Sequence, residues 1–208
     1  RRSKQLARML TQCTDSDLVD TLTYAFREII RNVVEHSESA TLQYCAQYWP
    51  TRHLVEIAIL DTGIGIRSSL SKNPYLIAET DRDALNLSLV PGVSGKTYKG
   101  KAGNPYDVWK NSGFGLYLTS RLCGNGGSFF ICSGDAGILL KKNGKHYLNA
   151  TFLGTAIRLK LLTNRAQTLK QSLRRFLREG DEIAKAFLDG SPVTASRASR
   201  MLWDDFRR

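Results

Sequence analysis

Long apolar runs and patterned cysteines are both missing from this sequence of 208 residues. No apolar run approaches the ~18 residues that a membrane-spanning helix needs, so we expect no membrane partner. The four cysteines, Cys13, Cys45, Cys123 and Cys132, have no CxxC spacing. The absence of CxxC spacing argues against a metal site built from cysteines, and free thiols fit a reducing, cytoplasmic setting. No P-loop lysine motif and no Ser/His/Asp or Cys/His pairing for nucleophilic catalysis stands out.

The composition is that of a globular protein with a strong positive charge. Hydrophobic residues make up 42% of the chain and charged residues 24%, which suits one good core and a small appendage. The formal net charge of +11 indicates an anionic partner, which could be nucleic acid, an acidic protein or a polyphosphate. No helix-turn-helix, zinc-finger or RNP-type motif stands out, so nucleic acid remains open as a partner but is not favoured.

Apolar periodicity predicts helices at both ends of the chain and strands between them. We expect helices over 1–13, 14–36, 81–90, 115–123 and 201–206, and strands over 41–49, 54–60, 128–133, 137–140, 146–152 and 155–162. From residue 164, Gly180 separates two helical stripes, which either fold back on the domain or form a partner or dimer surface. Trp203 and Phe206 are the aromatic candidates for such a surface. Cys45 and Cys132 fall in predicted strands, where we expect small core residues.

Polar residues recur one helical turn apart on the helix predicted over 14–36, at Glu28, Asn32 and His36. On a helical wheel Glu28 borders the apolar stripe, while Asn32 and His36 step into it. The wheel directs three charged neighbours away from the stripe: Arg27, Arg31 and Glu35. A carboxylate and a carboxamide on one rigid element could orient a water and hold Mg²⁺, which takes oxygen ligands. The alternative is a salt-bridged surface glutamate, an ordinary polar asparagine and a structural histidine.

An acidic residue leads into a double-glycine turn at Asp61-Thr-Gly-Ile-Gly-Ile66. Asp61 follows an apolar strand and could accept a hydrogen bond from an adenine amino group. Gly63 and Gly65 would let the backbone approach the base closely. A simple strand-to-loop turn is the alternative.

A second glycine turn, Asn111-Ser-Gly-Phe-Gly-Leu116, opens a predicted helix. Gly113 and Gly115 suit phosphate binding by free backbone N–H groups and by the positive end of the helix. Thr155, which follows Gly154, could bind a water near the base. The alternatives are a loop that merely needs glycine torsions and a surface threonine.

The chain between 67 and 112 is too long for a plain connection, because structureless loops above about 12–15 residues are usually lids, binding loops or disorder. Its stretch from Ser94 to Gly103 is rich in glycine and lysine, which suits a segment that seeks phosphate. We therefore expect residues 67–112 to form a lid.

In this order, the segments resemble the GHKL ATP-binding domain, or Bergerat fold, over about residues 15–162. Glu28 and Asn32 fit its N box, and residues 61–65 its G1 box. Residues 113–116 fit its G2 box, and residues 154–155 resemble its later Gly-Thr element. The resemblance implies an α/β (α+β) two-layer sandwich, with a mixed, mostly antiparallel sheet covered on one face by helices. It divides the chain into an N-terminal helical segment (1–14), an ATP-binding domain (15–163) and a helical C-terminal extension (164–208).

Within the family, the chain looks closest to histidine-kinase-like and anti-sigma-factor serine-kinase-like ATP-binding proteins. The resemblance implies ATP and Mg²⁺ as cofactors, Glu28 as the general base, Asn32 as the Mg²⁺ ligand and Asp61 as the adenine reader. The expected nucleotide-binding residues are Asn32, Asp61, Gly63, Gly65, Ile66, Gly113, Phe114, Gly115, Leu116 and Thr155.

Three functions stay open on this reading. The leading one is an ATP- and Mg²⁺-binding switch with slow hydrolysis, read by a protein partner or a second copy through the lid and the C-terminal helices. The second is a protein kinase that transfers phosphate to a serine, threonine or histidine of a partner. The third is a basic adaptor for nucleic acid or an acidic protein, with a vestigial pocket. Intact Glu28, Asn32 and Asp61 count against the third.

Overall fold

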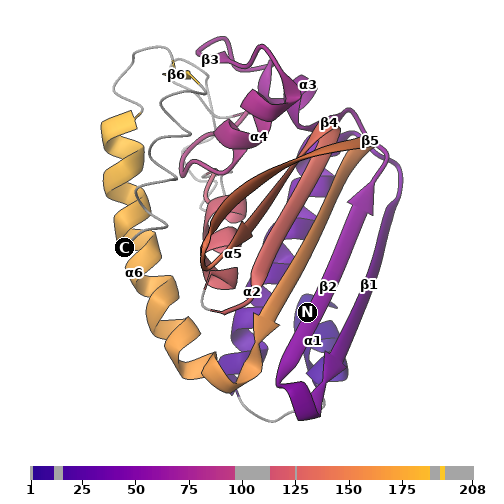
Figure 1. Ribbon diagram of the computed structural model, residues 1–208, viewed down its shortest axis with the longest axis vertical. Helices are drawn as coiled ribbons and strands as arrows, with labels where there is room; N and C mark the ends of the chain where they lie inside the picture. The colour runs from indigo at the N-terminus through magenta and orange to yellow at the C-terminus, as the bar shows by residue number, and fades with distance from the viewer. Residues whose placement is uncertain (1, 12–15, 97–112, 125, 188–192, 195–208) are drawn as a thin grey trace.

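The computed structural model describes residues 2–11, 16–96, 113–124, 126–187 and 193–194, which form an α+β fold (Figure 1). A four-stranded antiparallel sheet forms one layer, and helices cover one of its faces. The predicted helix over 201–206, with Trp203 and Phe206, lies outside the described residues, as do Cys13 and residues 97–112 of the predicted lid. Among the residues that the structure describes, no helix is both long and apolar enough to cross a membrane.

The helical layer is built on α2 (Ser16–Asn32), whose apolar stripe faces the sheet. Its largest stripe residues, Leu22, Phe26 and Ile29, are fully buried, as the periodicity predicts. Helix α1 (Arg2–Thr11) packs against α2, and α5 (Gly115–Cys123) packs beside it. After α2 the chain continues as a π-helical turn, labelled η1 (Val33–Ser37), which resets the angular spacing of the side chains that follow.

The sheet has the strand order β1-β2-β5-β4, and every neighbouring pair is antiparallel. Its strands are β1 (Leu42–Trp49), β2 (Leu54–Asp61), β4 (Ser128–Lys141) and β5 (Gly144–Leu162). The four short strands predicted after residue 128 are therefore two long ones, because irregularities around Gly134 bend β4 without ending it. Parallel pairing in the described chain occurs outside this sheet, between β3 (Leu76–Ile77) and β6 (Val193–Thr194).

Cys45 corrects one sequence-based expectation. It is exposed rather than a core residue, whereas Cys132 is buried as expected. Cys45 lies opposite Ala58 on β2, and the alternation of β2 buries Ile57 and Ile59 on the other side. Cys45 therefore faces the side of the sheet that the helices leave uncovered.

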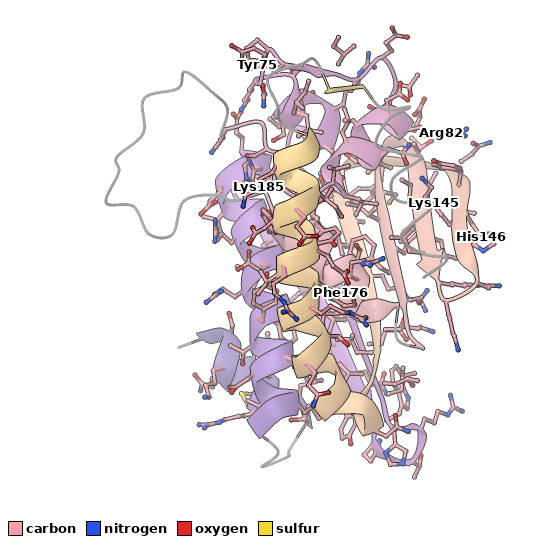
Figure 2. All side chains as sticks on the ribbon, turned by 90° about the vertical axis from the view of Figure 1, so that its left-hand side faces the viewer. Tyr75, Arg82, Lys145, His146, Phe176 and Lys185 are labelled. Atoms are coloured by element: carbon pink, nitrogen blue, oxygen red, sulfur yellow. The ribbon has the colours of Figure 1, made fainter. Side chains whose placement is uncertain are left out.

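Helix α6 (Ala166–Phe187) runs through Gly180, so the predicted break there is wrong. A Cβ at Gly180 would come within 2.7 Å of the Phe114 ring and 2.9 Å of the Tyr117 ring. The glycine thus permits close packing of α6 on α5 rather than a helix end. Phe176, only 4% exposed, also packs against Tyr117, so α6 folds back on α2 and α5 (Figure 2).

The described part of the predicted lid, residues 67–96, is a small folded unit. It contains most of α3 (Gly65–Leu70), then β3, then α4 (Asp81–Ser88), which confirms the helix expected in this stretch. The unit has an apolar cluster separate from the main core: Leu70, Leu76, Ala84, Leu87, Val90 and Val93. Thr80 caps α4 by accepting a hydrogen bond from the Asp83 N–H, and Asp83 accepts one from the Thr80 N–H.

Thr80→Ala should lower the free energy of unfolding by about 1 kcal/mol, because the exposed α4 terminus loses its cap without disturbing the core. Urea denaturation followed by circular dichroism measures the change. Thr80→Ser keeps the hydroxyl and should stay within about 0.5 kcal/mol of wild type. Equal losses in both variants would show that the capping hydroxyl does not stabilise the fold.

Candidate functional site

A cleft of about 780 Å³, open mouth included, lies between α2, the lid unit and the start of α5. Most of the sequence-predicted residues meet there, although they come from four separate segments of chain. The predicted residues that line the cleft are Glu28, Asn32, Asp61, Gly65, Ile66, Gly113, Gly115, Leu116 and Thr155. Gly63 and Phe114 do not line it.

The register of the sheet brings the floor of the cleft together. Asp61, the last residue of β2, pairs with Thr155 on β5, and Thr155 pairs with Ser133 on β4. Asp61 is 2% exposed and Thr155 is 8% exposed, so both polar side chains are buried. Buried polar groups need hydrogen-bond partners, which the protein or a ligand in the cleft can supply.

Burial raises the pKa of the Asp61 carboxyl, and hydrogen bonds with backbone groups of Gly63 and Thr155 lower it in part. The Gly63 N–H donates to Asp61 Oδ1 over 2.9 Å. Gly63 itself has a packing role, because a Cβ there would overlap the carbonyl oxygen of Ser37. The Ile64 N–H donates to that same oxygen over 2.8 Å, so the glycine turn is fixed against the end of the π-helical turn.

Ser133 is a positioning residue that the sequence analysis missed. Its hydroxyl donates to the Gly154 carbonyl over 2.6 Å and accepts the Ile66 N–H over 3.0 Å. It thereby fixes the first turn of α3 to the sheet. A Cβ on Gly65, which has φ +76°, would approach the Ser133 Oγ to 2.9 Å. The sequence signal was a small polar residue in an apolar strand, which is not specific.

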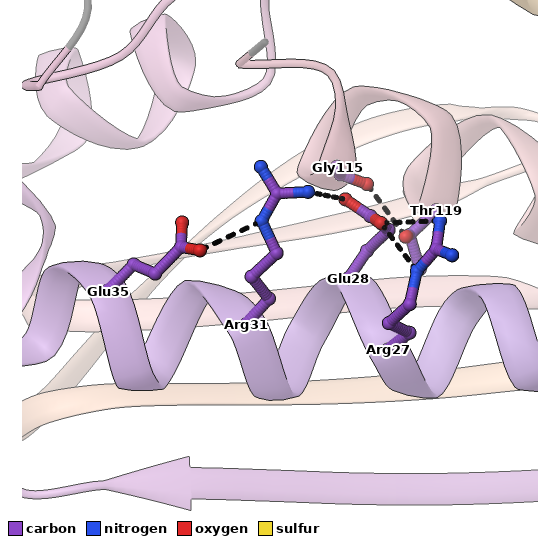
Figure 3. Close-up of polar contacts among 6 residues, drawn as sticks. All are labelled: Arg27, Glu28, Arg31, Glu35, Gly115 and Thr119. Atoms are coloured by element: carbon purple, nitrogen blue, oxygen red, sulfur yellow. Dashed lines mark hydrogen bonds and ion pairs between the residues drawn. The ribbon is translucent and has the colours of Figure 1, made fainter. Parts of the chain in front are cut away.

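A chain of ion pairs runs along α2 beside the cleft (Figure 3). The Glu28 carboxylate lies 3.2 Å from an Arg27 guanidinium nitrogen and 3.8 Å from an Arg31 nitrogen. Arg31 also donates to Glu35 Oε1 over 3.1 Å. Arg31 lines the cleft, so the wheel was wrong to direct it away, because a long side chain three residues after Glu28 reaches back to it. Arg27 and Glu35 do not line the cleft.

Glycine lets α5 approach Glu28 and Asn32. A Cβ on Gly115 would lie 3.1 Å from Glu28 Oε2 and 3.5 Å from Asn32 Nδ2. The Asn32 Nδ2 is buried and has no hydrogen-bond partner among the described residues. Its carboxamide therefore keeps polar capacity for a ligand in the cleft. No cluster of three or more His, Cys, Asp or Glu that could hold a metal occurs in the described ranges.

Gly113 and Phe114, the two residues before α5, pack against different parts of the fold. Gly113 has φ +67°, its carbonyl accepts the Gly92 N–H over 3.2 Å, and a Cβ there would meet Val93 at 2.6 Å. The start of the α5 segment is thus joined to the lid unit beside the cleft. Phe114 instead packs edge-on against Tyr117, with ring centroids 6.4 Å apart, and belongs to the α5–α6 contact.

His36 lines the cleft as a neutral side chain. Burial, as the largest cause, and the positive charge of Lys96 together lower its pKa from 6.5 to about 4. Glu35 raises the pKa, while Arg31 and Lys72 lower it slightly. At neutral pH this imidazole therefore adds no positive charge to the cleft.

Comparisons with known proteins identify no family. No family model matches the chain, and no curated protein is significantly similar to it. One solved structure that it resembles is described as the N terminal domain of a DNA repair protein, at 12% identity and a TM-score of 0.37. The match covers 89% of this chain and 48% of that one, so the chain spans about half of its length. A TM-score this low carries no argument.

The lowered pKa of His36 predicts a pH-dependent stability. Between about pH 6.5 and pH 4 the unfolded chain binds a proton at His36 and the folded protein does not, so the free energy of unfolding falls as the pH is lowered. Urea denaturation at pH 7 and pH 5 should show a smaller fall for His36→Gln than for wild type.

His146→Gln is the matched control, because His146 is exposed on β5 (Figure 2). It should reproduce the fall seen in the wild type. If His36→Gln also keeps the full fall, then His36 is not buried as a neutral group.

Proposed function

We propose that the cleft binds ATP with Mg²⁺, and that the chain acts as a nucleotide-dependent switch with slow ATP hydrolysis. The observation that carries the proposal is convergence. Residues selected from the sequence for adenine, metal and phosphate contacts come from four distant segments, yet nine of the eleven line one cleft. A chance set of turns and surface polar residues has no reason to converge in this way.

Asp61 is the proposed adenine reader. Its carboxylate is almost fully buried at the floor of the cleft, where an unsatisfied oxygen is costly. The carboxylate already has backbone hydrogen bonds with Gly63 and Thr155, and an adenine amino group would add a further donor. Thr155, opposite Asp61 in the sheet, could bind the base or a bridging water. Gly65, whose backbone lies against Ser133, keeps the wall beside the base thin.

Asn32 is the proposed Mg²⁺ ligand. Mg²⁺ retains several waters and binds phosphate oxygens, so one protein oxygen is enough to position it. Asn32 lines the cleft, and its carboxamide oxygen would be the metal ligand. When bound, Mg²⁺ neutralises phosphate charge. Gly113 and Gly115, at the start of α5, offer backbone N–H groups to the phosphates.

Glu28 is the proposed general base. Its side chain is 10% exposed and lies one turn before Asn32 on the same helix. That placement sets a carboxylate near the phosphate side of the cleft, where it could orient a water. The two arginines that pair with it compete with a water for its oxygens. This competition is consistent with slow turnover.

Asp61→Asn should weaken MgATP binding at least tenfold, because it removes the buried negative acceptor for the adenine amino group. Isothermal titration of MgATP into wild type and variant measures the loss. Asp135→Asn, an exposed carboxylate outside the cleft, should bind as the wild type does.

Unchanged affinity in Asp61→Asn would contradict the adenine assignment. If wild type binds no nucleotide, the basic-adaptor function becomes the leading one, and a salt-dependent affinity for nucleic acid or an acidic protein is then the measurement to make.

Glu28→Gln should retain MgATP affinity within about threefold and cut phosphate release about 10²-fold, as expected for loss of a general base. Phosphate release under saturating MgATP measures the change. Glu79→Gln, an exposed residue outside the cleft, serves as the control. Equal rates in wild type and Glu28→Gln would make Glu28 a structural residue.

A further inference from the structure

The side chains that line the cleft carry more negative than positive charge, although a polyphosphate is itself an anion. Two are carboxylates, Glu28 and Asp61, and His36 is held neutral by burial. Within the described lining, Arg31 is the one permanently charged cation. Mg²⁺ would neutralise part of the phosphate charge, and a positive side chain would counter the repulsion that remains between a terminal phosphate and Glu28.

Arg31 is held between two carboxylates of unequal strength. Its Nε donates to Glu35 Oε1 over 3.1 Å, which is a good hydrogen bond. Its Nη1 lies 3.8 Å from Glu28 Oε2, which is an ion pair beyond hydrogen-bond distance. The side chain is 22% exposed and already lines the cleft, so a ligand bound there lies beside it. The contact with Glu28 is therefore the looser of the two.

We infer that Arg31 binds the terminal phosphate of a nucleoside triphosphate and selects it over a diphosphate, in exchange for its ion pair with Glu28. The inference rests on the proposed function and names the residue that reads the phosphate. Glu35 keeps the guanidinium directed along α2 during the exchange. The planar fork of an arginine suits two phosphate oxygens at once, which a lysine cannot match.

The exchange makes the pairing of the Glu28 carboxylate depend on whether a terminal phosphate is bound. While Arg31 stays on Glu28, each carboxylate oxygen has a cationic neighbour, since Arg27 pairs with Oε1 and Arg31 with Oε2. When Arg31 moves to the terminal phosphate, Oε2 becomes open to a water. A diphosphate does not draw Arg31 away, so Glu28 stays paired after the terminal phosphate has left.

Arg27 provides a matched control on the same helix. It pairs with the same carboxylate over 3.2 Å, but it is 48% exposed and does not line the cleft. Removing Arg27 changes the surroundings of Glu28 without removing a phosphate ligand. The ratio of ATP to ADP affinity therefore separates the two arginines.

Isothermal titration of ATP and of ADP, each with Mg²⁺, into wild type, R31Q, R31K and R27Q tests the inference. R31Q should weaken ATP binding about tenfold or more, as for a lost hydrogen bond to a charged group, and leave ADP affinity within threefold. R31K should fall between wild type and R31Q. R27Q should keep the wild-type ratio. Unchanged ADP affinity also shows that the R31Q cleft is folded.

Three other outcomes overturn the inference and are distinguishable from one another. If wild type binds both nucleotides and R31Q keeps the wild-type affinity for each, Arg31 does not read the phosphate, although the proposed function stands. If wild type binds neither nucleotide, the proposed function fails and the role of Arg31 fails with it. Equal loss of ATP and ADP affinity in R31Q would make Arg31 a general support of the cleft and would likewise overturn the selection.

Discussion

The antiparallel register of β2 and β5 sets Asp61 opposite Thr155, and the cleft is arranged around that pair. A shift by one residue would turn both side chains to the uncovered face of the sheet, because successive residues of a strand alternate between faces. The register is protected by the alternation of β2, which buries Val55, Ile57 and Ile59 on the same side as Asp61. Ser133 then fixes the position of α3 relative to the sheet, because its hydroxyl accepts a hydrogen bond from the Ile66 N–H. The same apolar residues that stabilise the core thus fix the polar floor of the site.

The second constraint is the balance of charge along α2. Alternating acidic and basic residues at i, i+3 and i, i+4 spacings usually contribute only a few tenths of a kcal/mol each on an exposed helix. Here the Glu28 side chain is only 10% exposed, yet it retains two cationic partners. Loss of both partners would leave a buried, uncompensated carboxylate, which is costly. Any ligand that draws Arg31 away must therefore help to stabilise the buried Glu28 carboxylate. In our proposal a metal-bound phosphate and the water ordered beside it do so.

Local chemistry explains which parts of the fold and site could be predicted from the sequence. The stripe of α2 and the glycine turns before α3 and α5 carry their own signals, so their positions follow from spacing alone. Gly63 and Gly180 were misleading, because each glycine is there for close packing against a distant segment: Ser37 for one, Phe114 and Tyr117 for the other. Arg31 was missed because a wheel places Cβ atoms and ignores where a long side chain bends. Such contacts depend on tertiary structure, which periodicity does not encode.

The lid unit connects these features to the proposed switch. Its cluster around Leu70 and Leu87 is separate from the main core, yet its chain supplies Ser69, Ser88 and Ser94 to the cleft. The unit is also packed on the main core, because Leu85 and Leu89 at α4 are members of that core. It is joined to the rest at several places, among them the Gly92–Gly113 hydrogen bond, the β3–β6 pairing and the packing of α4 on β4. The first of these lies at the start of α5, where the phosphates would bind. A phosphate in the cleft would therefore act on the lid unit at one of its attachments, which is the geometry that a nucleotide-dependent switch requires.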